Sequence, residues 1–236
     1  MYPKEELMKD FSRVGAIVTG SHIVYTPKEE GWFHGEAYVD KDLISMHPKL
    51  LGLCTDQMVV SIEEAGLLRE IQVIASPAAG AISWGQVLAA QLCRRIVDRE
   101  ILFVFCEKEF KDPKNPAEFE FKFRSGFAKA IKGKKVLIAE DIANPGTSAK
   151  KAAKSVIECG GEVIGVSVLC NRSGQEAHDY LAPWPLLAVA DANMKKWHED
   201  ECPLCPQGIP LNMSLGKAKD WLATEKGQAW AAKYMK

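Results

Sequence analysis

Two adjacent acids followed by a turn and a helix form the segment of this sequence best suited to chemistry. An apolar run that begins at Val136 ends in Glu140 and Asp141, and the helix expected after the turn opens with Thr147 and Ser148. Main-chain N–H groups in the first turn of a helix, assisted by hydroxyl side chains, can bind a phosphate. Carboxylates placed just before that helix can accept hydrogen bonds from the vicinal hydroxyls of a ribose. The segment therefore predicts a site for a phosphorylated pentose.

The alternative for this segment is an ordinary strand–helix turn in which the hydroxyls only cap the helix. The pair of acids and the glycine at position 146 favour the phosphate site over capping alone.

The elements that must position these residues form a regular pattern after residue 70. Apolar runs at 70–75, 101–106, 136–139, 163–169 and 186–190 are the expected strands. The expected helices are 5–14, 40–47, 58–68, 147–159 and 215–234, with another that follows the turn at 76–80 and ends near 97. Apolar strands that alternate with helices indicate an α/β fold, a parallel-sheet core flanked by helices. Ligands in such sheets bind beyond the carboxyl ends of the strands, where the acidic segment lies.

Composition limits the classes of protein to consider. The chain has 236 residues, is 47% hydrophobic and shows no internal repeat or linker, so we expect a single domain over 1–236. Its 30 basic and 31 acidic residues nearly cancel, which argues against a nucleic-acid partner or a membrane-surface helix. The N-terminus does not resemble a signal peptide, and no apolar window is long enough to span a bilayer. Most of the seven cysteines sit in apolar runs, which is typical of a reduced, cytoplasmic protein.

The acidic segment resembles the phosphoribosyl pyrophosphate motif of type I phosphoribosyltransferases, and the fold of that family is the fold expected here. The residues that match the motif are Glu140, Asp141, Ile142, Gly146 and Ser148. Asn144 and Pro145 stand where the family usually has threonines, and a proline offers no N–H donor. The binding residues that the resemblance implies are Glu140, Asp141, Asn144, Gly146, Thr147 and Ser148.

Further segments resemble bacterial orotate phosphoribosyltransferase in their order and spacing. Residues 15–40 are similar to the segment that forms a small hood over the base, which implies Tyr25 and Thr26 as base-binding residues. The turn at 76–80 resembles the pyrophosphate loop, whose contacts would be Ala78, Ala79 and Gly80. Small residues let a backbone approach a ligand closely, although a tight strand–helix turn explains them equally well.

The charged segment after the second core strand resembles the start of the family's mobile catalytic loop. Lys108, Glu109, Lys111 and Asp112 match, whereas Glu107 and Pro113 replace an arginine and a histidine. The resemblance implies that Lys108 and Lys111 stabilise the departing pyrophosphate and that Asp141 completes the catalytic set. The alternative is a solvated run of charges.

Arg172 follows the next strand, at the place where orotate enzymes have an arginine that contacts the carboxylate of the base. A guanidinium group matches a planar carboxylate in shape and charge. The implied activity is transfer of a phosphoribosyl group to orotate, which gives orotidine monophosphate and pyrophosphate, with Mg²⁺ as cofactor and a homodimer as the assembly. The alternatives are the same chemistry on another base, or a non-catalytic regulator that senses a nucleotide or phosphoribosyl pyrophosphate.

Cys202 and Cys205 form a Cys-x-x-Cys pair, with His198 four residues before it. Such spacing is compatible with zinc, but a closed site needs a fourth ligand, for which His178 is the only distant candidate. A simple buried turn is the favoured interpretation, and no residue is assigned as a metal ligand.

Overall fold

A computed structural model describes residues 3–27, 31–110, 118–192 and 194–235. The chain divides into two compact units. The core unit comprises Met1–Asp10 and Ile44–Asn193, and the accessory unit comprises Phe11–Leu43 and Met194–Lys236. The segment 15–40 belongs entirely to the accessory unit. Helices α1 (Lys4–Arg13) and α2 (Lys41–Ser45) each run from one unit into the other.

The described strands of the core unit form a six-stranded sheet in the order β5-β4-β3-β6-β7-β8. Their bounds are β3 Val73–Pro77, β4 Leu102–Phe110, β5 Phe119–Phe123, β6 Lys135–Ala143, β7 Glu162–Asn171 and β8 Leu186–Asp191. All neighbouring strands run parallel except β4 and β5, which form an antiparallel ribbon. The prediction of a mostly parallel sheet is therefore confirmed.

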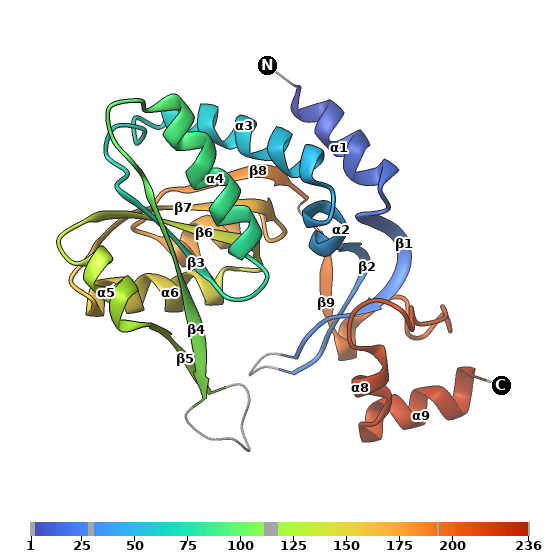
Figure 1. Cartoon of the computed structure of the whole chain (residues 1–236). Coiled ribbons are helices and arrows are strands. Elements are labelled where there is room, and N and C mark those ends of the chain that lie inside the picture. Colours follow the sequence, from blue (N-terminus) through green and yellow to red (C-terminus); the bar gives the residue numbers. More distant parts are fainter. Residues whose placement is uncertain (1–2, 28–30, 111–117, 193, 236) are drawn as a thin grey trace. The chain divides into compact units, whose positions relative to one another are not determined.

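Helices cover both faces of this sheet. Figure 1 shows α3 (Pro48–Glu64) and α4 (Ile82–Arg95) on one face, with α5 (Ser125–Ile131) and α6 (Thr147–Glu158) on the other. Buried side chains of α6 recur every three or four residues, which places one stripe of the helix against the sheet. The helix expected at 58–68 begins ten residues earlier, at Pro48, because proline is well tolerated in the first turn of a helix. None of the described helices has both the length and the apolar character needed to cross a bilayer.

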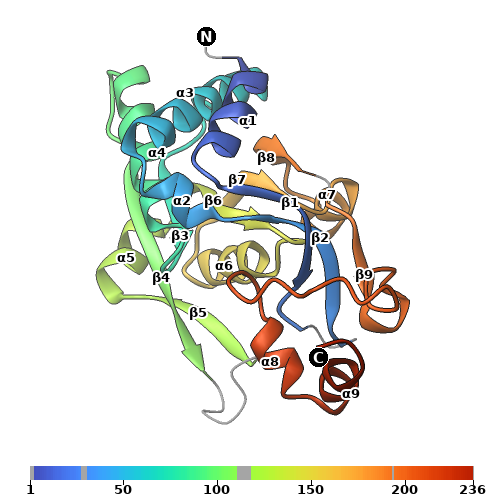
Figure 2. The same cartoon turned by 90° about the vertical axis from the view of Figure 1, so that its right-hand side faces the viewer.

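The accessory unit contains an antiparallel sheet in the order β1-β2-β9. Figure 2 shows β1 (Ile17–Val24) and β2 (Phe33–Val39) side by side, and β9 (Lys196–His198) pairs with β2. The single helix expected at 215–234 is wrong, because Thr224 interrupts it between α8 (Ala218–Leu222) and α9 (Glu225–Tyr234). The Thr224 hydroxyl donates to the Trp221 carbonyl and accepts from the Gly227 N–H, so it ends one helix and caps the next.

Candidate functional site

Strand β6 carries Glu140 and Asp141 to the carboxyl edge of the core sheet. Glu140 is buried and Asp141 is partly exposed. The Asp141 N–H donates to Glu140 Oε1 over 3.0 Å, and the Ile142 N–H donates to Asp141 Oδ1 over 2.6 Å. One oxygen of each carboxylate is thus held by the local backbone, which restricts the orientation of both side chains before any ligand arrives.

Gly146 sets the geometry of the turn between β6 and α6. Its φ of 126° belongs to a region that side chains rarely adopt. A Cβ atom there would also lie 2.9 Å from Cδ1 of the buried Leu181. Backbone conformation and packing therefore both require glycine at the residue that precedes α6. The neighbouring Asn144–Pro145 peptide bond is cis.

The first turn of α6 presents main-chain donors. The Lys150 N–H donates to the Gly146 carbonyl, and no described side chain caps the helix. The N–H groups of Thr147, Ser148 and Ala149 have no acceptor among the residues that the structure describes. The positive end of the helix dipole lies at the same place, so this turn suits an anion.

The turn after β3 also presents main-chain N–H donors. The Ala78 N–H donates to the Cys106 carbonyl over 2.8 Å, and the Ala78–Ala79 peptide bond is cis. Within the described part of the chain, the N–H groups of Ala79 and Gly80 have no acceptor. Since β3 and β6 are neighbouring parallel strands, this turn and the turn before α6 lie at the same edge of the sheet.

Asn171 organises the loop after β7, and the sequence analysis missed it. This buried side chain donates to the Gly174 carbonyl over 3.1 Å and to Asp191 Oδ1 over 3.0 Å, and it accepts from the Ser173 N–H over 3.1 Å. Asparagine at a strand end commonly bonds to the backbone two residues ahead, which is the signal that could have identified it.

Arg172 lies in this loop, and its main chain is next to the end of β6. Its N–H donates to the Ala143 carbonyl over 3.0 Å, and its side chain is partly buried. The Ser173 hydroxyl donates to Asn144 Oδ1 over 3.0 Å, which joins the loop after β7 to the turn before α6. The amide group of Asn144 then remains as the donor that this side chain can offer a ligand.

Strand β4 continues beyond the sheet and carries Lys108 with it. Pairing with β3 ends at Cys106, and residues 107–110 pair with β5. Lys108 is exposed, and its Nζ lies 4.5 Å from the centre of the Phe119 ring. Strand β5 is the other arm of this ribbon. Lys111 and Pro113 lie outside the described residues.

Glu107 stands where the family usually has an arginine, and here it pairs with Arg124, which lies between β5 and α5. Two hydrogen bonds of 2.8 and 2.9 Å join the guanidinium group to both carboxylate oxygens. The hydrogen bond with Arg124 lowers the pKa of the Glu107 carboxyl below its ordinary value. The negative charge introduced by this departure is therefore balanced locally.

Tyr25 and Thr26 lie in the accessory unit. Tyr25 is buried, and its hydroxyl donates to the Ala37 carbonyl over 2.5 Å. Thr26 is exposed just after β1.

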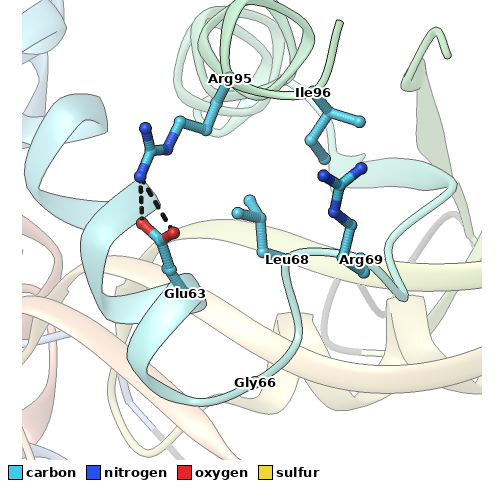
Figure 3. A pocket seen from close by; sticks show the side chains of 6 residues that line it. All are labelled: Glu63, Gly66, Leu68, Arg69, Arg95 and Ile96. Carbon is cyan, nitrogen blue, oxygen red and sulfur yellow. Dashed lines mark hydrogen bonds and ion pairs between the residues drawn. The ribbon is translucent and has the colours of Figure 1, made fainter. Parts of the chain in front are cut away.

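One cavity of the core unit lies elsewhere. This pocket of about 430 Å³ is lined by Glu63, Gly66, Leu68, Arg69, Arg95 and Ile96. These residues precede β3 and β4, at the amino ends of the strands, and the guanidinium group of Arg95 is already paired with Glu63 (Figure 3). Ligands of parallel sheets bind at the opposite edge, so the turns after β3, β6 and β7 are the better candidate.

Residues 44–204 match the model of the phosphoribosyl transferase domain, which covers more than half of the chain. The chain belongs to the phosphoribosyl transferase domain family. The matched region contains the acids, the start of α6, the turn after β3 and Arg172.

Relatives of this family member include orotate phosphoribosyltransferases. The chain is 28% identical to that of Thermoanaerobacter sp. (strain X514) over 208 residues, which are 88% of this chain and 95% of the relative. It is 32% identical to that of Campylobacter fetus over 185 residues, which cover 74% and 83% of the two chains. A solved orotate phosphoribosyltransferase from Aeropyrum pernix superimposes with a TM-score of 0.57 at 20% identity, over 78% of this chain and 93% of that one, and supports the fold alone.

Proposed function

We propose that this phosphoribosyltransferase transfers the phosphoribosyl group of phosphoribosyl pyrophosphate to orotate, with orotidine monophosphate and pyrophosphate as products. The observation that carries the proposal is the arrangement at the end of β6. Two carboxylates oriented by backbone hydrogen bonds stand directly before a glycine turn and a helix whose first N–H groups have no acceptor among the described residues.

The ribose 5-phosphate would bind at the start of α6. The N–H groups of Thr147 and Ser148, their hydroxyls and the amide of Asn144 supply donors, while Gly146 lets the turn adopt its conformation. Glu140 and Asp141 would accept hydrogen bonds from the ribose hydroxyls. Their charge also favours the positive character that develops on the ribose as the anomeric bond breaks.

The pyrophosphate would bind at the turn after β3. The N–H groups of Ala79 and Gly80 can approach its oxygens because the side chains of residues 78–80 are small. Lys108 on the ribbon, together with Lys111, would stabilise the negative charge on the leaving group. No covalent intermediate with the enzyme is needed for this reaction.

The donor set at the end of β6 suits Mg²⁺, which prefers oxygen ligands and often binds through substrate phosphates together with one or two carboxylates. Glu140 and Asp141 are the residues that would hold it beside the substrate. When bound, the ion would neutralise charge on the pyrophosphate.

Orotate is favoured as the base because Arg172 follows β7 and because the relatives described above are named orotate phosphoribosyltransferases. The guanidinium group would pair with the carboxylate of the base. Tyr25 and Thr26 stay proposed base contacts, and a cytoplasmic homodimer is the proposed assembly.

The test is a product assay by mass spectrometry with Mg²⁺, phosphoribosyl pyrophosphate and a panel of orotate, uracil and purine bases. Orotidine monophosphate as the only nucleotide supports the proposal, and a different nucleotide would keep the chemistry but replace the base. A folded sample that gains thermal stability from phosphoribosyl pyrophosphate and forms no nucleotide would indicate a regulator instead.

A further inference from the structure

Four side chains of the kinds that bind transition metals meet inside the accessory unit. They are His22 of β1, His34 of β2, and Cys202 and Cys205 of the loop that follows the 3₁₀ helix η1 (Glu199–Glu201). One ligand atom from each residue lies within 4.8 Å of all the others. Three of the four residues are buried, and Cys205 is partly buried.

The spacing of these atoms suits a tetrahedral ion. Zn²⁺ binds thiolate sulfur at about 2.3 Å and imidazole nitrogen at about 2.0 Å, so a tetrahedron separates its ligand atoms by roughly 3.3–3.8 Å. Here His22 Nε2 lies 3.1 Å from His34 Nδ1 and 3.6 Å from Cys202 Sγ. Cys205 Sγ lies 3.2 Å from His34 Nδ1 and 3.7 Å from His22 Nε2.

The orientation of His22 is set by an outer contact, as is usual for a metal ligand. Its Nδ1 lies 2.8 Å from the carbonyl oxygen of Ile209, and a carbonyl can only accept, so Nδ1 carries the proton. In the neutral ring Nε2 then presents its lone pair to His34 and the two sulfurs. His34 packs edge-on against Trp221, with ring centres 4.5 Å apart, and turns Nδ1 toward the same point.

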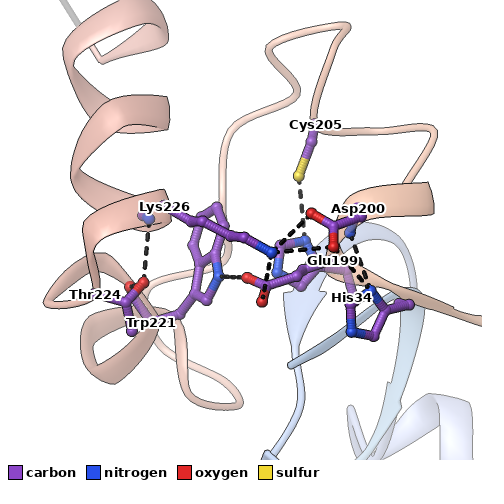
Figure 4. Close-up of polar contacts among 9 residues, drawn as sticks. His34, Glu199, Asp200, Cys205, Trp221, Thr224 and Lys226 are labelled. Carbon is purple, nitrogen blue, oxygen red and sulfur yellow. Dashed lines mark hydrogen bonds and ion pairs between the residues drawn. The ribbon is translucent and has the colours of Figure 1, made fainter. Parts of the chain in front are cut away.

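The ligand residues pack against aromatic side chains of the accessory unit, His22 against Trp230 and His34 against Trp221. Both tryptophans belong to an apolar cluster whose buried members are Val24, Leu211, Ala218, Trp221 and Trp230. Polar contacts fix the chain on both sides of the Cys-x-x-Cys turn. The Trp230 indole donates to the Cys205 carbonyl, and Figure 4 shows Glu199 bonded to the Trp221 indole and Asp200 bonded to Lys226.

We propose that the accessory unit holds a structural Zn²⁺ ion bound by His22, His34, Cys202 and Cys205. Two thiolates and two imidazoles favour zinc among the common ions. Four protein ligands close the tetrahedron and leave no position for a substrate, which is typical of a structural site. The ion would join β1 and β2 to a loop about 180 residues further along the chain. It is separate from the Mg²⁺ proposed for the phosphoribosyl site.

The two histidines that the sequence offered as zinc ligands, His198 and His178, are not part of this cluster. The ring of His198 instead lies 3.4 Å from the carboxylate of Asp200, and His178 belongs to α7 (Gln175–Leu181) of the core unit. The favoured interpretation of the Cys-x-x-Cys pair as a simple buried turn gives way to this proposal, because two distant histidines complete the ligand set.

The experiment measures metals in the full-length protein, expressed with added zinc and purified without chelators. We expect one zinc per chain by mass spectrometry. After exchange of zinc for Co²⁺, we expect the intense visible bands of a tetrahedral cobalt–thiolate complex. The variant Cys205→Ser should lose most of the zinc, whereas Cys159→Ser, which changes another partly buried cysteine in the core unit, should retain it.

Three results would overturn the proposal. The first is a folded wild-type protein without zinc and without a tetrahedral cobalt spectrum. The second is a disulfide between Cys202 and Cys205 in protein whose thiols were blocked at lysis, which would indicate a redox pair. The third is equal zinc content in the wild type and Cys205→Ser, which would place the ion elsewhere. If Cys205→Ser does not fold, the zinc content and cobalt spectrum of the wild type decide the question.

Discussion

Replacement of Gly146 by alanine tests the link between the turn before α6 and phosphate binding. The substitution forces a side chain into a φ of 126°, which costs on the order of 1–3 kcal/mol. The new Cβ would also lie 2.9 Å from Leu181, a buried side chain with little room to move, and overpacking of this kind costs about 1–3 kcal/mol. We therefore expect Gly146→Ala to lower the free energy of unfolding by about 2–6 kcal/mol in total.

The two contributions can be separated by a double-mutant cycle with Leu181→Ala, measured by urea unfolding. Removal of the leucine side chain relieves the contact but not the strained backbone, so the double variant should recover about 1–3 kcal/mol relative to the sum of the single changes. Gly52→Ala is the matched control, because Gly52 lies inside α3 and, apart from its chain neighbours and the backbone of its own helix, no atom of the described residues lies within 4 Å of the added Cβ. This control should be neutral or slightly stabilising.

Gly146→Ala should also bind phosphoribosyl pyrophosphate more weakly, because a shift of the turn moves the first N–H groups of α6. We expect KM for this substrate to rise by about 10-fold or more, the effect of losing one charge-assisted hydrogen bond. Wild-type stability together with wild-type KM in Gly146→Ala would refute the role assigned to this turn.

Three further predictions concern other parts of the core unit. Replacement of both Lys108 and Lys111 by alanine should reduce kcat by orders of magnitude and leave the melting temperature almost unchanged; unaltered turnover would remove both residues from the mechanism. Arg172→Ala should raise KM for orotate by about 10–100-fold with little change in KM for phosphoribosyl pyrophosphate, whereas the exposed control Arg94→Ala should alter neither. The pKa of Cys54 is raised to about 12 by burial, so the native state holds its proton more tightly than the unfolded state does. The contribution of Cys54 to the free energy of unfolding should therefore be fully present below the ordinary thiol pKa and decrease as the pH rises from there toward 12. Urea unfolding at several pH values should show a weaker decrease for Cys54→Ala than for the wild type. The same dependence of the unfolding free energy on pH in both proteins would contradict the assignment.

The sequence alone determined the α/β architecture and the position of the strand–turn–helix segment that is proposed to bind the phosphoribosyl group. Both depend on local patterns: buried parallel strands are continuous apolar runs, and the residues from Glu140 to Ser148 follow one another along a single strand–turn–helix unit. Local chemistry also explains the errors in helix bounds. Thr224 as a helix cap and Pro48 as a first-turn residue both mark helix ends, and the spacing of apolar residues alone does not reveal either of them.

Contacts between distant parts of the chain were decided only by the tertiary structure. The bond from Ser173 to Asn144 joins two loops because β6 and β7 are neighbours in the sheet, a pairing that no short segment encodes. The histidines that meet the Cys-x-x-Cys pair lie about 170–180 residues away, and His198, the neighbour in sequence, faces Asp200 instead. The physical reason is that a ligand set requires atoms a few ångströms apart in space, and only the folded backbone determines which distant residues meet that condition.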